Sequence, residues 1–268
     1  MFRPARDKTT TMISILRVIL APLALMAWQL VYPTNCLALI LPALTAVILF
    51  LYIWHVRSVP QKLVADFYFS KRTLIYGFFF SRIRLFLFGS IYAVVLSATL
   101  YITASLWTPI YFGVLTADAL ILFFIYHMMA SWSRSGLSVA PGNVPLVSKQ
   151  IVVALNSLAL IIVFTWLALD GVPPAYAQVS GGFLAVMEAA ADGRFSNCDY
   201  INPIISVARQ VEGIKYHLVD LSTKLVDNGQ IQVLTASVLL FAGGLPALAY
   251  SQFVLQLISG GTAEEAQA

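Results

Sequence analysis

Long apolar runs separated by short polar stretches make up most of this chain. A helix needs about 20 residues to cross the hydrocarbon core of a bilayer. Six runs are long enough, and they lie at about 12–32, 36–56, 85–107, 110–131, 150–169 and 231–258. The pattern therefore predicts an all-α polytopic membrane bundle with about six transmembrane helices.

The ends of the runs carry residues that suit the ends of membrane helices. Pro33 and Pro109 lie in short turns after the first and third runs, and proline cannot continue a helix because it lacks a backbone N–H. Tryptophan favours the membrane–water boundary because its ring is apolar and its N–H needs a polar partner. All five tryptophans lie at or near the end of a run: Trp28, Trp54, Trp107, Trp132 and Trp166.

The sixth run is longer than a membrane helix needs to be. As a straight helix, 231–258 would extend about 42 Å at about 1.5 Å per residue, against a hydrocarbon core of about 30 Å. Gly243-Gly244 and Pro246 lie near its middle. This pattern favours one tilted helix with a kink. The alternative is a broken helix that lines a solute site, as in some transporters, but no charged residue accompanies the glycines.

Composition and charge support a membrane location. Hydrophobic residues make up 60% of the chain and charged residues 10%, whereas soluble domains contain about 25% charged residues. Because most basic residues flank the apolar runs, the net charge of +4 favours contact with lipid head groups over nucleic acid.

The distribution of lysine and arginine predicts the orientation. These residues gather in the N-terminal arm and in 57–84 and 133–149, and the two hairpin turns contain none. Since Lys and Arg accumulate in cytoplasmic loops, both termini are expected in the cytoplasm, and a bacterial inner membrane is the expected location. The predicted organisation is a membrane domain (1–169), an extracytoplasmic helical segment (170–230), a final transmembrane helix (231–258) and a flexible tail (259–268).

The cytoplasmic segment 57–84 alternates basic and aromatic residues. Such a mixture can stack on nucleic-acid bases, but here it leads directly into the third run. An interfacial contact with anionic lipid is the simpler interpretation. The expected lipid-facing bases are Lys71, Arg72, Arg82 and Arg84.

The extracytoplasmic segment 170–230, called the outer segment below, contains the clearest helical period outside the spans. Asn202 and Pro203 predict an N-cap and a first helical residue, and Asn228-Gly229 predicts the end. Gly213, which is not on the apolar face of this helix, would weaken the helix by about 1 kcal/mol relative to alanine. The apolar positions alternate spacings of three and four, typical of a helix with one apolar face; they are Ile204, Val207, Val211, Ile214, Leu218, Leu221 and Leu225.

This stripe needs an apolar partner. One interpretation is that the helix folds onto the short apolar segment 182–190 or onto the membrane surface. The other is that it docks a second copy or another protein. A membrane-surface helix is usually rich in Lys and Arg on its polar face, and the mixed charges of this one suit protein contact better.

Few ionisable residues lie inside the spans, and each is a candidate for an ion or proton site. Asp118 lies near the middle of the fourth run, and Arg17 and His127 lie near the inner ends of the first and fourth. In the alternative interpretation Asp118 is neutral or hydrogen-bonded to a neighbour such as Asn156, and only fixes packing. Arg17 can extend its charged end to the cytoplasmic surface.

The two cysteines, Cys36 and Cys198, fall on the same predicted non-cytoplasmic side. A disulfide is permitted there if that side is oxidising, provided the two Cα atoms come within about 7 Å. Two free thiols are the alternative. The three histidines are scattered and form no His-x-x-x-His pair, so neither a metal site nor a cofactor is expected.

Three classes of function are compatible with these features. The first is a structural or assembly subunit of a secretion, conjugation or respiratory membrane complex, which docks its partners through the outer helix. The second is a small-solute or ion channel or transporter that uses Asp118 and a broken sixth span. An enzyme is least favoured, because the chain has no nucleophile elbow and no glycine-rich phosphate loop.

Overall fold

The computed structural model describes residues 8–68, 82–135, 144–170, 174–179, 181–224 and 229–259. Within these ranges every regular element is a helix, as predicted. The elements are α1 (Lys8–Val31), η1 (Cys36–Leu39), α2 (Ile40–Tyr68), α4 (Arg82–Ala104), α5 (Pro109–Ser135), α6 (Val144–Asp170), η3 (Ala175–Gln178), α7 (Gly182–Ala191), α8 (Asn202–Lys224) and α9 (Gly229–Ser259).

Five of these helices are long and apolar enough to cross a membrane, namely α2, α4, α5, α6 and α9. Helix α1 adds a shorter apolar stretch, Leu16–Val31. These helices confirm the predicted helical membrane bundle and identify the chain as an integral membrane protein.

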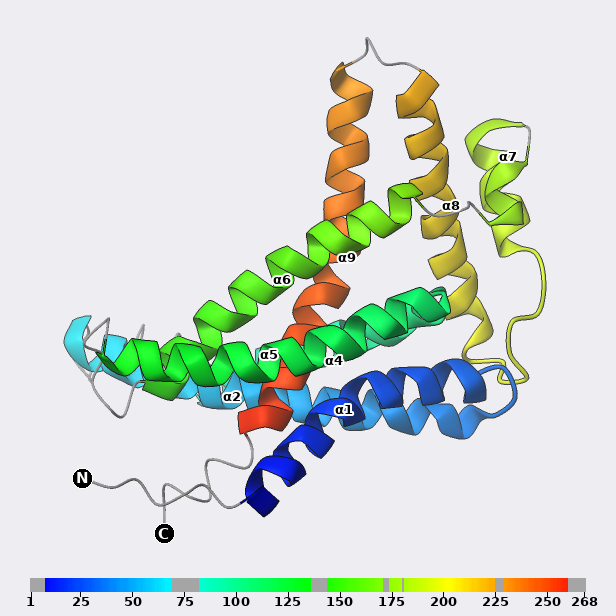
Figure 1. Cartoon of the computed structure of the whole chain (residues 1–268). Helices are drawn as coiled ribbons and strands as arrows, with labels where there is room; N and C mark the ends of the chain where they lie inside the picture. Colours follow the sequence, from blue (N-terminus) through cyan, green and yellow to red (C-terminus); the bar gives the residue numbers. More distant parts are fainter. Residues whose placement is uncertain are drawn as a thin grey trace.

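The bundle is built from two helical hairpins that α9 crosses (Figure 1). The turn between α1 and α2 lies at the same end of the bundle as the turn between α4 and α5. A 2.6 Å hydrogen bond from Gln29 Nε2 to the carbonyl of Trp107 joins the two ends. Helix α9 contacts α1, α2, α4, α5, α6 and α8. It is therefore the central helix of the fold.

Apolar residues occur on both sides of the transmembrane helices. Leu25, Leu100 and Tyr250 are fully buried between helices, whereas Val94 and Leu158 are exposed on the outer surface of the bundle. Lipid tails are as apolar as a protein core, so an exposed leucine on a membrane helix carries no penalty. Some polar side chains in the core are paired, as between Thr45 Oγ1 and the Tyr101 hydroxyl at 2.8 Å.

Two of the five tryptophans lie in protein rather than at a lipid boundary. Trp28 and Trp107 are 3% and 6% exposed, and the Trp28 ring packs against Tyr32 and Tyr101. These two rings therefore meet protein rather than lipid, because neighbouring helices cover them.

Helix α9 continues without interruption from Gly229 to Ser259, with Pro246 inside it. A broken helix at Gly243-Gly244 is not what the structure contains. The first half of α9 runs beside the second half of α8, where Thr235 Oγ1 donates to the carbonyl of Leu218 at 3.2 Å. The outer ends of α8 and α9 project beyond the two hairpins (Figure 1). The segments 214–224 of α8 and 229–241 of α9 are called the arm below.

Candidate functional site: a cavity between the outer helix and the bundle

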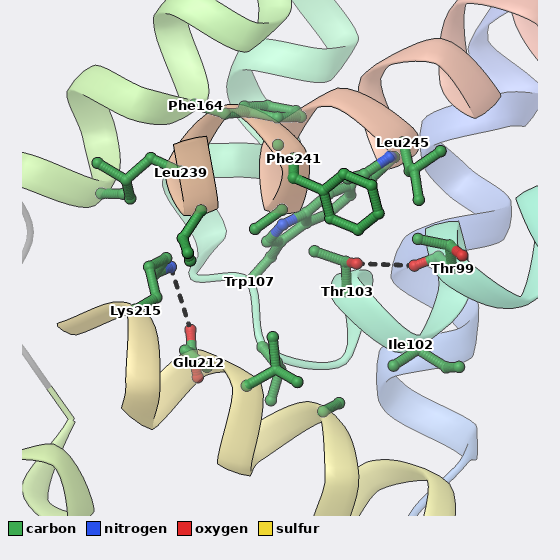
Figure 2. A pocket seen from close by; sticks show the side chains of 18 of the residues that line it. Thr99, Ile102, Thr103, Trp107, Phe164, Glu212, Lys215, Leu239, Phe241 and Leu245 are labelled. Carbon is green, nitrogen blue, oxygen red and sulfur yellow. Dashed lines mark hydrogen bonds and ion pairs between the residues drawn. The ribbon is translucent and has the colours of Figure 1, made fainter. Parts of the chain in front are cut away.

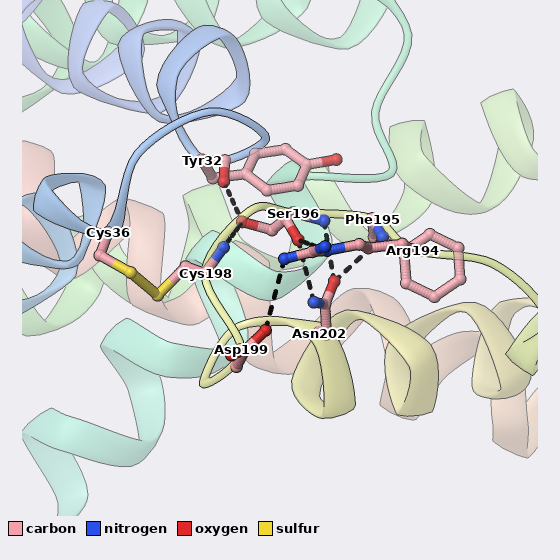
Figure 3. Close-up of polar contacts among 8 residues, drawn as sticks. All are labelled: Tyr32, Cys36, Arg194, Phe195, Ser196, Cys198, Asp199 and Asn202. Atoms are coloured by element: carbon pink, nitrogen blue, oxygen red, sulfur yellow. Dashed lines mark hydrogen bonds and ion pairs between the residues drawn. A yellow bond between two sulfur atoms is a disulfide. The ribbon is translucent and has the colours of Figure 1, made fainter.

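The outer segment is attached to the first hairpin beside η1. A disulfide joins Cys36 to Cys198, with 5.1 Å between their Cα atoms. Two hydrogen bonds lie next to it, from Ser196 Oγ to the carbonyl of Tyr32 and from the Asn197 N–H to the carbonyl of Pro33 at 2.8 Å. These bonds fix the start of α8 against the end of the bundle (Figure 3).

The side chain of Asn202 stabilises the loop before α8 rather than the first turn of the helix. Its Oδ1 accepts from the backbone N–H groups of Phe195 and Ser196 at 3.0 and 2.8 Å, and its Nδ2 donates to the carbonyl of Ser196 at 2.9 Å. The predicted N-cap hydrogen bond is therefore wrong, because the loop folds back over this side chain (Figure 3).

The described part of the molecule contains a cavity of about 980 Å³. Its walls come from the turn between α4 and α5, from α6, from α9 and from α8 (Figure 2). Apolar side chains make up most of its surface, among them Trp107, Phe164, Leu239, Phe241 and Leu245. Ligand pockets commonly have volumes of about 300–1,000 Å³, so this cavity is large enough for a sizeable apolar molecule.

The stripe of α8 has three environments. Ile204, Val207 and Val211 line the cavity and remain exposed, Val207 by 58%. Ile214, Leu218 and Leu221 are half-buried, with Leu218 beside α9. Leu225 lies outside the described residues. The fully buried face of α8 is a different one and contains Ile205.

Helix α8 does pack against the short helix α7, but not through the stripe. The contact lies at Gly213, where an added Cβ atom would come within 2.9 Å of Val186 Cγ1 and 3.7 Å of the Ala190 side chain. Gly213 therefore allows two helices to approach closely. In the sequence, Gly213 stood out only as a residue that weakens the helix and does not belong to its apolar stripe.

One wall of the cavity contains a buried ion pair. Lys215 Nζ lies 3.9 Å from Glu212 Oε1, and the two side chains are only 15% and 13% exposed. Burial lowers the pKa of the Lys215 ammonium, because desolvation disfavours its charged form, and Glu212 partly opposes this shift. Figure 2 shows both side chains reaching from α8 towards the cavity.

The second carboxylate oxygen of Glu212 has its own partner. It accepts a hydrogen bond from the hydroxyl of Tyr176 in η3, and burial together with this carboxylate raises the pKa of Tyr176. The Arg209 guanidinium lies between two rings, 4.5 Å from the centre of Tyr176 and 4.3 Å from that of Phe195. Glu212 and Lys215 line the cavity, and Arg209 adds a positive charge beside them without lining it.

Asp118 belongs to a separate polar cluster inside the bundle. Asn156 Nδ2 donates to Asp118 Oδ2 at 3.2 Å and to Ser251 Oγ at 3.0 Å, which links α5, α6 and α9. Tyr250 donates its hydroxyl proton to the carbonyl of Leu115 at 2.5 Å nearby. The structure thus contains the hydrogen bond to Asn156 named by the packing interpretation.

The other two candidates for an ion site are not brought together with Asp118. Arg17 is exposed on α1. The His127 ring packs on Phe123, with 4.6 Å between ring centres. His127 lies nine positions after Asp118 on α5, about 13 Å along a helix.

The predicted lipid-facing bases lie largely beyond what the structure describes. Lys71 and Arg72 fall outside the described residues, and so does the side chain of Arg82. Arg84 is described, and its guanidinium lies 6.0 Å from the centre of the Phe88 ring.

Within the described ranges, no group of three or more His, Cys, Asp or Glu side chains is placed to hold a metal ion. Comparison with known proteins adds no assignment to this geometry: no family model, no curated protein and no solved structure matches the chain.

Proposed function

We propose that this chain is an integral membrane subunit of a larger membrane assembly, of the secretion, conjugation or respiratory type, and that its arm docks the neighbouring subunit. The observation that carries the proposal is the set of apolar side chains that the arm leaves uncovered. Val233, Leu234, Leu240 and Phe241 are all more than half exposed, Val233 by 67%.

Lipid is a poor cover for the outer end of the arm. Asp220 and Lys224 form a 2.6 Å ion pair there, and both side chains are more than half exposed, so this end of α8 needs water or polar surroundings. The start of α9 runs back along the same stretch of α8, through the contact between Thr235 and Leu218. Val233 and Leu234, which lie beside this stretch of α8, therefore suit another protein.

The docking proposal predicts a specific crosslink. Both natural cysteines are joined in the disulfide, so Val233→Cys adds a single reactive thiol. A short thiol-reactive crosslinker, applied to native membranes, is expected to link most of these chains to one neighbouring polypeptide. The mass of the adduct will tell a second copy from an unlike subunit.

Leu158→Cys is the matched control for this experiment. Leu158 is exposed to a similar extent, 57%, but it lies on α6, outside the arm. Crosslinking to the same extent from Leu158→Cys, or no adduct from Val233→Cys, would contradict docking through the arm.

The proposal includes a location, the bacterial inner membrane, with both termini in the cytoplasm. Two observations support it. Lysine and arginine are absent from the hairpin turns at Pro33 and Pro109 and abundant in 57–84. The bridge between Cys36 and Cys198 lies at the same end as these turns, as expected for an oxidising compartment. The basic segment 57–84 would then meet anionic lipid on the cytoplasmic side.

This topology predicts opposite results from two reporter fusions. A reporter that is active only in the cytoplasm should be active when it is fused after Ala268. The same reporter should be inactive when inserted between Asp192 and Gly193, an exposed turn after α7. A periplasmic reporter at each site serves as the control and should give the reverse pattern. Activity of the cytoplasmic reporter at Asp192 would refute the orientation.

A further inference from the structure

The cavity beside α8 combines a large apolar surface with one buried cation, Lys215. Its apolar walls come from Trp107, Phe164, Leu239 and Phe241, and the stripe residues of α8 line the opposite side. A cavity of this kind suits a long hydrocarbon chain, because burying apolar area stabilises a complex in rough proportion to that area.

The amino group of Lys215 has unused hydrogen-bonding capacity. An ammonium group carries three donors. Its contacts in the described residues are Glu212 Oε1 at 3.9 Å and the Tyr216 ring at 4.5 Å. A charge-assisted hydrogen bond is about 2.7–2.9 Å long, so the pair with Glu212 does not satisfy these donors. Burying a cation with incomplete pairing is costly, and an anion in the cavity would remove that cost.

The surrounding charges favour an anion over a cation. Glu212 is already engaged by the Tyr176 hydroxyl, and Arg209 lies next to the same ring. The two charged residues that line the cavity, Glu212 and Lys215, balance each other, and Arg209 adds a positive charge beside them. A cationic head would meet the ammonium of Lys215, while the carboxylate that could balance it is already bonded to Tyr176.

We propose that this cavity binds an amphiphile with a long apolar chain and an anionic head, with the head at Lys215 and the chain against Trp107 and Phe241. A free fatty acid and an anionic phospholipid both have this chemistry. The site shares Phe241 with the arm, but its test uses the purified chain without a partner, so its outcome is independent of the docking proposal.

Quenching of tryptophan fluorescence tests the proposal in the purified full-length chain in a non-ionic detergent. A bromine-labelled stearic acid quenches an indole that it touches. The signal from the cavity is the difference in quenching between the natural chain and Trp107→Phe. Taking this difference removes the contribution of the tryptophans that face detergent. The same brominated chain is compared as a carboxylic acid, as its methyl ester and as a primary amine.

The acid is expected to bind about tenfold more tightly than the ester, the effect of about one charge-assisted hydrogen bond, and the amine is expected to bind no better than the ester. Brominated phosphatidylglycerol compared with phosphatidylcholine tells a phospholipid source from a free fatty acid. Equal affinities for acid and ester, or quenching that does not depend on Trp107, would overturn the proposal.

Two variants locate the head group. Lys215→Met keeps the length of the side chain and removes its charge, so it should abolish the preference for the acid. Lys224→Met is the matched control, because Lys224 lies on the same helix but is exposed and paired with Asp220, and it should keep the preference. Loss of the preference in both variants would contradict the role of Lys215. If Lys215→Met fails to fold, the comparison of acid with ester on the natural chain still decides.

Discussion

Replacing Cys36 and Cys198 together by serine is expected to destabilise the folded protein by up to about 5 kcal/mol. The bridge joins residues 162 positions apart. In the chain-entropy model, a cross-link restricts the unfolded chain more as the closed loop becomes longer. The double replacement leaves no unpaired thiol, so the effect reports the bridge itself. The midpoint of thermal unfolding in detergent, followed by circular dichroism, measures it.

The same variant should loosen the outer segment before the bundle unfolds. Without the bridge, the loop before α8 is held to the first hairpin by the hydrogen bonds of Ser196 and Asn197, each worth about 1 kcal/mol. Trypsin should then cleave faster after Arg194, which is exposed in this loop. Ser196→Ala, which keeps the disulfide, is the control and should have a much smaller effect. Identical unfolding midpoints for the natural chain and the double serine variant would show that the bridge contributes nothing.

Asn156→Leu is expected to cost about 1–3 kcal/mol, because it leaves the carboxyl group of Asp118 without its partner inside the bundle. The amide of Asn156 donates to both Asp118 and Ser251, and Asn156 itself is buried. Leucine has a similar size and offers no donor. Ser251 keeps its own 2.8 Å hydrogen bond to the carbonyl of Ala247, so the loss falls mainly on Asp118.

A double variant, Asp118→Leu with Asn156→Leu, distinguishes packing from a requirement for the carboxylate. Removing both polar partners together is often nearly neutral, so the double variant should recover most of the stability that Asn156→Leu loses. Thermal unfolding of the three variants in one detergent provides the measurement. A double variant as unstable as Asn156→Leu would contradict the packing role of this cluster.

The sequence alone determined which segments form long apolar helices of the kind that cross a membrane, and roughly where each one ends. Length and apolar composition decide whether a segment spans a bilayer, and both are local properties. The turns at Pro33 and Pro109 were predicted for the same reason, since proline acts on its own backbone. The helix that contains Val207 and Leu218 was also evident, because a period of three and four residues identifies a helix whatever it packs against.

Only the tertiary structure decided which side of each helix meets protein. In a membrane helix both sides are apolar, because lipid and core place similar demands on a side chain, so no pattern in the sequence could show that Trp28 and Trp107 are buried. The close approach of α7 at Gly213 and the placing of Lys215 against the cavity also depend on distant segments. The cavity exists because Cys198 holds the start of α8 at the first hairpin while Thr235 of α9 contacts its far half, and these positions are remote from one another along the chain.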